Sequence, residues 1–183
     1  MRFACLLADG FEDIEALGTV ALLRRSGISV DLVNVMNQLT AKGSFTTEVV
    51  TDVTLKKTNA KDYDGLFIPG GRQAAVLRQD KDVLELVRQF AGGDKWLMAI
   101  CAGPTIFGVL GLLDGKHYTS FPGTEEYMPK AIRENKSVVT DKKIITAIGA
   151  GAVYEFAFEI IKNIFGAQKQ NELKKRILFR EFE

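Results

Sequence analysis

The fold class follows from residues 3–35, which read FACLLADGFEDIEALGTVALLRRSGISVDLVNV. The apolar run 3–8 is short and is typical of a buried strand. Residues 11–25 carry apolar side chains at a helical period, and the β-branched run 28–35 predicts a second strand. A strand, a helix and a strand in so short a segment indicate a βαβ unit, with parallel strands and a right-handed crossover.

The same alternation continues along the chain and predicts an α/β sandwich with a mostly parallel central sheet. The segment 39–55 is rich in Thr and Val and alternates weakly, which favours a hairpin or an excursion at a sheet edge. The remaining strands are expected at 65–69, 96–100, 117–121, 137–140 and 143–148, and the remaining helices at 82–90, 102–113, 152–165 and 168–182. We find no linker or repeat, so residues 1–183 are interpreted as one domain that ends in an amphipathic basic helix.

Composition excludes several classes of protein. Apolar residues make up 46% and charged residues 26%, as in ordinary globular domains. A net charge of +1 lacks the footprint of a nucleic-acid binder. Two cysteines and one histidine argue against a disulfide framework or a metal centre, and no cofactor is expected. The first apolar run is too short for an export signal and no run is long enough to span a membrane, so we expect a cytoplasmic protein without a membrane partner.

The most informative segment is AICAGPT, residues 99–105. A buried strand ends at Cys101 and a helix follows at once, with Pro104 in its first turn, where the missing N–H has no cost. Gly103 permits a tight corner. This pattern is typical of a nucleophile elbow, which exposes its side chain at the carboxyl edge of the sheet, where ligands bind in open α/β folds.

The elbow predicts a reactive thiol at Cys101. The positive end of a helix lowers a thiol pKa, and the thiolate is the nucleophile. The backbone N–H groups of Ala102 and Gly71 are expected to converge beside the sulfur and to stabilise an oxyanion or an oxidised sulfur. Cys5 lies within a strand among apolar residues, so we interpret it as an inert core residue.

A second signal is the acidic run at the start of the first helix, which contains Glu12, Asp13 and Glu15. Glu12 and Asp13 have an ordinary explanation, because acidic residues stabilise a helix N-terminus. Glu15 either has the same role or points into a pocket under the elbow. In the second case burial and a neighbouring thiolate would raise its pKa, and it would shuttle a proton.

Taken together, these residues resemble the DJ-1/ThiJ/PfpI superfamily, over essentially the whole chain. The resemblance rests on ADGFEDIEA after the first strand, GLFIPGG at 65–71, AICAGPT at 99–105 and AIGAGAVYEFAFEI at 147–160. Within this superfamily, the sequence is similar to the deglycase-like (ThiJ) branch. The resemblance implies a flavodoxin-like three-layer α/β/α sandwich, a homodimer, and a cofactor-free protein that acts on a small reactive carbonyl compound or on peroxide.

The same resemblance assigns roles to residues. Cys101 matches the oxidation-prone nucleophile and Glu15 the carboxyl that is hydrogen-bonded to it. Gly71 and Ala102 match the backbone donors, and the pocket is expected to include Gly70, Phe121 and Pro122.

One departure from the family bears on the reaction. The deglycase branch often has a histidine beside the cysteine, and here Phe121 occupies that place. His117 lies four residues earlier, about 13 Å away along a strand, and we interpret it as a surface or strand-end residue. Ala102 also replaces the adjacent histidine of the protease-like relatives. Without a Cys–His pair, slow turnover is expected.

Three functions remain open. The first is a deglycase or glyoxalase in which the Cys101 thiolate adds to a 2-oxoaldehyde or its adduct and Glu15 relays a proton. The second is a non-enzymatic oxidative-stress sensor or chaperone that works through oxidation of Cys101. The third is a cysteine hydrolase resembling a peptidase, with His117 of a neighbouring subunit as the base.

Overall fold

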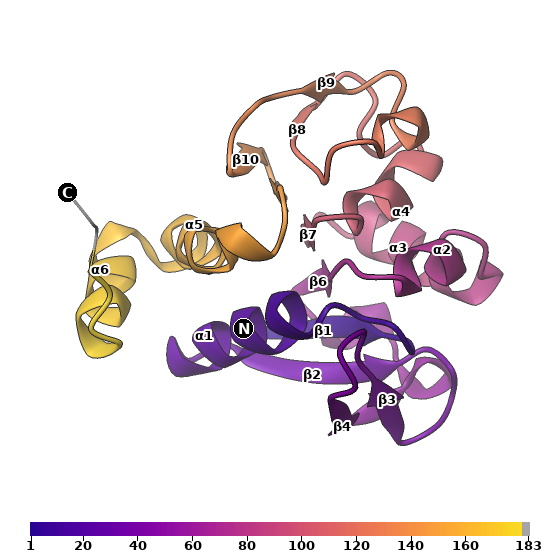
Figure 1. Cartoon of the computed structure of the whole chain (residues 1–183), viewed down its shortest axis with the longest axis horizontal. Coiled ribbons are helices and arrows are strands. Elements are labelled where there is room, and N and C mark those ends of the chain that lie inside the picture. Colours follow the sequence, from indigo (N-terminus) through magenta and orange to yellow (C-terminus); the bar gives the residue numbers. More distant parts are fainter. Residues whose placement is uncertain (181–183) are drawn as a thin grey trace.

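The computed structural model describes residues 1–180, and its elements alternate along the chain as expected (Figure 1). The strands are β1 (Arg2–Leu7), β2 (Ser29–Asn34), β3 (Thr40–Lys42), β4 (Glu48–Val50), β5 (Val53–Thr54), β6 (Gly65–Ile68), β7 (Trp96–Ile100), β8 (His117–Tyr118), β9 (Ile132–Arg133), β10 (Val138–Asp141) and β11 (Ile144–Ala147). The α-helices are α1 (Thr19–Arg25), α2 (Gln73–Leu77), α3 (Lys81–Gly92), α4 (Pro104–Val109), α5 (Val153–Phe165) and α6 (Ala167–Arg176). A π-helical turn (Ile14–Gly18) precedes α1, and 3₁₀ turns cover Leu55–Lys57, Ala60–Asp62, Glu125–Tyr127 and Ala150–Ala152.

The central sheet has seven strands in the order β10-β11-β7-β6-β1-β2-β5, and only the β10–β11 pair is antiparallel. Helices α1 and α5 cover one face and α2, α3 and α4 the other (Figure 1). Along β1, Phe3, Cys5 and Leu7 enter one core, whereas Ala4 and Leu6 enter the other. Burial on both faces explains why the strand is a continuous apolar run. The predicted flavodoxin-like three-layer sandwich is confirmed.

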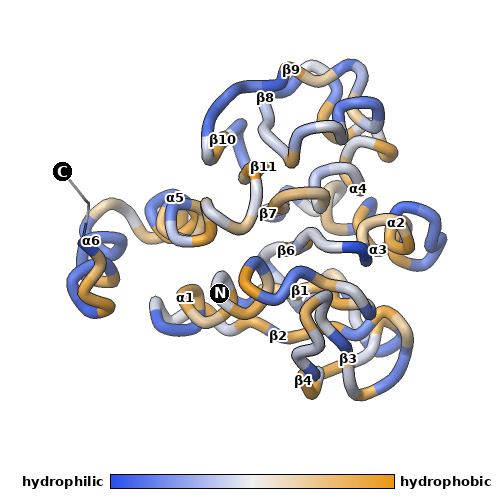
Figure 2. Tube along the Cα trace, viewed as in Figure 1, coloured by the Kyte–Doolittle hydropathy of each residue, from blue (hydrophilic) through white to orange (hydrophobic). Residues whose placement is uncertain are grey.

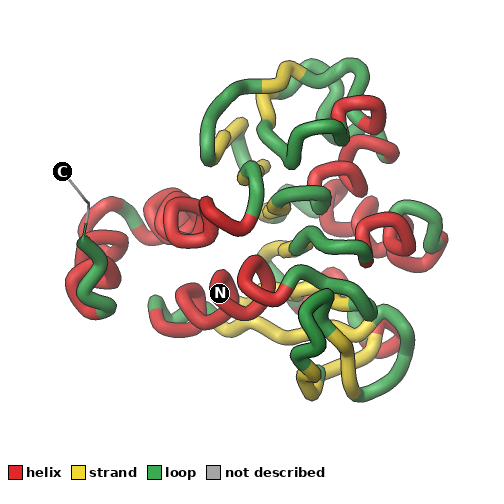
Figure 3. The backbone as a smooth tube through the Cα atoms, viewed as in Figure 1, coloured by secondary structure: helices red, strands yellow, loops and turns green. Residues whose placement is uncertain are grey.

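The segments beyond α4 and around α2 differ from the sequence prediction. Helix α2 and strand β9 were not predicted, and α4 covers only the middle of the expected 102–113 helix. Strand β8 has two residues instead of the predicted 117–121, and most of the chain between α4 and β10 is loop (Figure 3). The hairpin predicted within 39–55 is present as β3 and β4.

The last helix ends earlier than predicted. Helix α6 is mostly hydrophilic, as the blue colour of much of the helix in Figure 2 shows, and Leu173 is its buried apolar residue. It stops at Arg176, and Leu178 has a φ of 57°. This turn lets the Phe179 ring pack against Phe158, with the ring centroids 4.9 Å apart. The predicted span 168–182 is therefore wrong for residues 177–180, and its residues 181 and 182 lie outside the described part.

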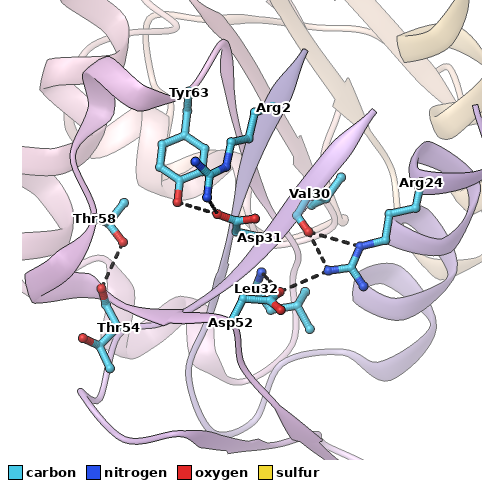
Figure 4. A network of polar contacts seen from close by, with 9 residues as sticks. All are labelled: Arg2, Arg24, Val30, Asp31, Leu32, Asp52, Thr54, Thr58 and Tyr63. Atoms are coloured by element: carbon cyan, nitrogen blue, oxygen red, sulfur yellow. Dashed lines mark hydrogen bonds and ion pairs between the residues drawn. The ribbon is translucent and has the colours of Figure 1, made fainter. Parts of the chain in front are cut away.

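A polar network ties the strands together near their amino ends (Figure 4). The Asp31 carboxylate accepts hydrogen bonds from the Arg2 guanidinium at 2.6 Å and from the Tyr63 hydroxyl at 2.8 Å. Beside it, the Asp52 carboxylate accepts from the Leu32 backbone at 2.8 Å. These bonds join β1 and β2 to the residues just before β5 and β6.

Candidate functional site

The predicted site residues follow three neighbouring strands and meet at the carboxyl edge of the sheet. Glu15 comes after β1, Gly70 and Gly71 come after β6, and Cys101 follows β7 directly. The order β7-β6-β1 places these three strand ends side by side. This is the edge at which open α/β sheets bind ligands.

Cys101 occupies a strained corner. Its φ is 62°, in the left-handed region that residues with a side chain rarely adopt. The corner is fixed by its own backbone N–H, which donates to the Ala147 carbonyl at 2.9 Å, and by the close approach of Gly103, at which a Cβ would lie 2.3 Å from the Ile68 carbonyl oxygen. Pro104 then begins α4. The geometry of a nucleophile elbow is therefore present.

Glu15 points inward from the π-helical turn Ile14–Gly18, and its side chain is 1% exposed. Its carboxylate is hydrogen-bonded to the Cys101 thiol and accepts from the backbone N–H groups of Gly70, at 2.8 Å, and Ala150. Glu12 takes the capping role instead, because its Oε2 accepts from the Glu15 backbone N–H at 2.7 Å. Of the two interpretations of Glu15, the structure supports the inward one. π-Helical turns are frequent at functional sites.

Burial raises the pKa of both members of this pair. The pKa of Glu15 rises to about 7, chiefly by desolvation, and the Cys101 hydrogen bond only partly opposes the shift. The pKa of Cys101 rises to about 12, first through burial and then through the Glu15 carboxylate beside it. The expected lowering of the thiol pKa is therefore wrong, because these two effects outweigh the N–H donors at the corner. Cys101 and Glu15 together hold a proton near neutral pH.

The backbone around the elbow supplies two polar contacts to Cys101. The N–H groups of Ala102 and Gly71 both donate to Cys101, and both act to lower its pKa. Gly70 is required by close packing, because a Cβ there would lie 2.6 Å from Cys101 Cβ and 2.7 Å from Glu15 Oε2. The polar groups around the sulfur are thus held by backbone and cannot rotate away.

The sulfur opens into a cavity of about 520 Å³, which Gly71 and Ala102 also line. Phe121 lines it as predicted, and its backbone N–H donates to the Cys101 carbonyl at 2.9 Å. Pro122 is exposed, and neither Pro122 nor Gly70, which were also expected in the pocket, is among the residues that line this cavity. The other lining residues, which the sequence did not single out as pocket residues, are Glu12, Ser44, Phe45 and Arg72.

Ser44 and Phe45 belong to the β3–β4 hairpin loop, which Asp13 holds over the site. The Asp13 carboxylate accepts from the Phe45 backbone N–H at 3.0 Å. The Ser44 N–H and hydroxyl donate to the carbonyls of Phe11 and Gly10. Burial opposes ionisation of Asp13, but hydrogen bonds from Thr47 and Phe45 outweigh it and hold its pKa below the usual value. Asp13 is therefore a loop anchor and not a simple helix-terminal charge.

The other candidate residues and the second groove of the described chain offer fewer reactive groups. His117 is exposed and its Nδ1 lies 2.7 Å from Glu134, away from the cavity, as expected. Cys5 is fully buried, and burial raises its pKa far above the usual value. A larger groove of about 790 Å³ runs between α1, α5 and the chain after α6, but its described lining contains no cysteine, serine, threonine or histidine.

Residues 1–180 contain neither a metal-binding cluster nor a membrane-spanning helix. No group of three or more His, Cys, Asp or Glu side chains is arranged to hold a metal ion there. No helix in this part has the length and apolar character that crossing a membrane would require. The homodimer, the single-domain assignment and the cytoplasmic location stay predictions.

Comparison with known proteins agrees with this geometry. The sequence model of the DJ-1/PfpI family matches residues 1–163. Protein dj-1beta of Drosophila melanogaster is 30% identical over 176 residues, with 94% of each chain covered. The crystal structure of Drosophila DJ-1beta superimposes with a TM-score of 0.90 over 98% of both chains, at 30% identity.

Two relatives have names that state an activity. A glutathione-independent glyoxalase of Caenorhabditis elegans is 32% identical over 169 residues, which cover 90% of this chain and 88% of the relative. A deglycase of Pyrococcus abyssi is 29% identical over 165 residues, which cover 88% of this chain and 98% of the relative.

Proposed function

Because the chain belongs to the DJ-1/PfpI family, we propose that it is a cofactor-free glyoxalase or deglycase that uses Cys101 and Glu15. The observation that carries the proposal is the hydrogen-bonded Cys101–Glu15 pair at the bottom of a cavity, with two backbone N–H donors aimed at the sulfur. The activities in the names of the worm glyoxalase and the archaeal deglycase support the same general kind of reaction.

The first step is addition of the thiol to the aldehyde carbon of a 2-oxoaldehyde. As the C–S bond forms, the Glu15 carboxylate takes the thiol proton and returns it to the aldehyde oxygen, which gives a hemithioacetal. A carboxyl group with a pKa of about 7 suits this exchange, since it both accepts and donates near neutral pH. General-base assistance replaces the preformed thiolate that the sequence suggested.

The second step moves hydrogen between the adjacent carbons. Glu15 removes the proton from the former aldehyde carbon and delivers it to the neighbouring carbon, while the hydroxyl of the hemithioacetal loses its proton and the ketone oxygen gains one. The first carbon is thereby oxidised to a thioester and the second is reduced to an alcohol, so no external oxidant is needed. The N–H groups of Gly71 and Ala102 stabilise the developing oxyanion. Water then cleaves the thioester and releases a 2-hydroxy acid and the free thiol.

The test is the formation of lactate from methylglyoxal. We expect the wild-type protein to be active and Cys101→Ala and Glu15→Gln to fall to the buffer rate, whereas Glu126→Gln, an exposed carboxylate outside the cavity, stays at the wild-type rate. Equal rates for the wild type and both site variants would refute the proposal.

A second candidate function is supported by the same polar groups. Two N–H donors and a carboxyl with a raised pKa surround the sulfur, and they suit the oxygens of a sulfinate. A role as an oxidative-stress sensor predicts that mild peroxide adds two oxygens, about 32 Da, at Cys101 and leaves Cys5 unchanged. Intact-protein and peptide mass spectrometry measure both sites, and equal oxidation of the two cysteines would refute this candidate.

A further inference from the structure

Arg72 lines the cavity of Cys101, yet the proposed reaction gives it no role. It follows Gly71, directly before α2, and its side chain is exposed. The guanidinium reaches toward the hairpin loop, where Nη2 donates to the Ser44 carbonyl at 3.4 Å. The guanidinium of Arg72 therefore bridges two segments that line the cavity, the loop after β6 and the hairpin loop between β3 and β4.

The charge of Arg72 has no ionic partner within residues 1–180. The ion pairs found there join other side chains, and none includes Arg72. Glu12 is the acidic residue in the cavity lining, and its Oε2 is already the acceptor of the Glu15 backbone N–H. A guanidinium that has no carboxylate partner and lines the same cavity as a nucleophile is suited to bind an anionic group of the substrate.

The rest of the cavity indicates that the substrate is more than a three-carbon aldehyde. The volume of about 520 Å³ lies within the range of pockets for small organic ligands. Phe45 is 71% exposed and Phe121 is 53% exposed, and both rings line the cavity. The walls thus offer apolar surface for the body of a substrate and one positive charge for an acidic group.

We propose that Arg72 makes the site selective for substrates that carry a carboxylate near the reactive carbonyl, such as the adducts of 2-oxoaldehydes with free amino acids. This rests on the proposed function and names its substrate class. In such an adduct the thiol of Cys101 displaces the amine. The C–S bond forms, the C–N bond breaks, and the thiol proton passes through Glu15 to the leaving amine. Adducts on protein side chains have no carboxylate beside the amine.

The first test does not depend on turnover. Iodoacetate and iodoacetamide differ by a negative charge and alkylate the same sulfur, so the ratio of their rates at one pH cancels the ionisation of the thiol. We expect the wild-type iodoacetate to iodoacetamide ratio at Cys101 to exceed that of Arg72→Gln by about threefold to tenfold, the range for a partly exposed charge pair. Arg72→Lys should keep part of the difference and lose it at high salt.

Arg88→Gln is the matched control, since Arg88 is an exposed arginine on α3 that does not line the cavity. It should leave the ratio unchanged, and circular dichroism should show that each variant is folded. An Arg72→Gln ratio equal to that of the wild type would overturn the inference. The same ratio is informative even if no lactate forms, in which case the proposed function fails while the anion preference of the site stands.

The second test uses two substrates that differ only in charge. Methylglyoxal is presented as its adduct with N-acetylcysteine, which has a carboxylate, and with N-acetylcysteine amide, which has none. We expect kcat/KM to favour the carboxylate adduct by about threefold to tenfold in the wild type, and the preference to vanish in Arg72→Gln. Equal values for the two adducts in an active wild-type protein would overturn the substrate class.

Discussion

The Glu15 carboxylate and the Cys101 thiol are hydrogen-bonded to each other, although one side chain comes from a turn after the first strand and the other from the end of β7. The Glu15 carboxylate raises the pKa of Cys101, because a carboxylate and a thiolate cannot both be charged at low cost in a buried site, whereas the hydrogen bond with the Cys101 thiol lowers the pKa of Glu15 and partly offsets its burial. The pair therefore behaves as a single acid–base unit, and a change to one member should be visible in the other.

Removal of the Glu15 charge should make Cys101 more acidic. The Glu15 carboxylate contributes to the raised thiol pKa through its charge and its hydrogen bond. In Glu15→Gln we expect the inflection of Cys101 alkylation by iodoacetamide to move to lower pH by about 1–3 units. The measurement is the alkylation rate against pH, with Glu126→Gln as the control. An unchanged inflection, or one at higher pH, would show that the two groups are not coupled.

The free energy of unfolding should depend on pH, because Glu15 titrates at different pH in the folded and unfolded chain. The pKa of Glu15 rises in the folded chain from the usual 4.5 to about 7. The contribution of Glu15 to the free energy of unfolding is fully present below pH 4.5 and is lost as the pH rises through 7. The reason is that Glu15 ionises at a lower pH in the unfolded chain than in the folded chain. The free energy of unfolding of the wild type, measured relative to Glu15→Gln in urea, should fall by about 3 kcal/mol between pH 4 and pH 8. A difference that stays constant with pH would contradict this.

Gly70 should not tolerate a side chain. A Cβ at this position would lie 2.6 Å from Cys101 Cβ and 2.7 Å from Glu15 Oε2, so Gly70→Ala has to separate the pair. We expect about 1–3 kcal/mol of destabilisation and a loss of lactate formation. Gly151→Ala is the control, since nothing lies within 4 Å of a Cβ there. If both variants unfold at the same urea concentration as the wild type and keep activity, the packing argument fails.

A histidine in place of Phe121 should speed the reaction. The Phe121 ring lines the cavity, and its backbone is hydrogen-bonded to that of Cys101, so an imidazole there would add a base beside the sulfur. We expect Phe121→His to raise the rate of lactate formation about tenfold at pH 7.5, which is less than the roughly 10²–10⁴-fold of a positioned general base, because the new imidazole is not preorganised. Phe45→His places the same ring on the hairpin loop and serves as the control. Equal gains in both variants would mean that proximity to Cys101 is not the cause.

The sequence predicts the central layers of this fold well and its periphery less well. The strands β1, β2, β6 and β7 are apolar runs with polar or glycine boundaries, and each was predicted within about two residues. Helix α2 was missed because a stretch of five residues is too short to show the helical period of apolar side chains. The last helix was extended too far because Ile177 and Leu178 continue its apolar pattern. Its end is set by the tertiary packing of Phe179 on Phe158, which no local pattern contains.

The sequence likewise predicts one part of the site well and another part poorly. Cys101, Glu15 and the two backbone donors were located from motifs that lie directly after strands, where topology decides which residues meet. The thiol pKa was predicted in the wrong direction because burial and a neighbouring charge depend on packing. Phe45 was missed as a cavity residue, since nothing in 39–55 indicates that its loop reaches across to the sheet edge. Arg72 was missed although it directly follows Gly71, because the motif assigned a role only to the glycine backbone.

The anchoring of the hairpin loop by Asp13 has a consequence for how this protein diversifies. The reactive pair is held by backbone amides at the strand ends, whereas the loop is held at Phe45 and Thr47 by the Asp13 carboxylate, which recognises main-chain and hydroxyl groups. Residues at the tip of the loop are therefore open to replacement without disturbing the acid–base pair. New selectivities are accessible by exchanging this one short segment, while the chemical machinery is inherited intact.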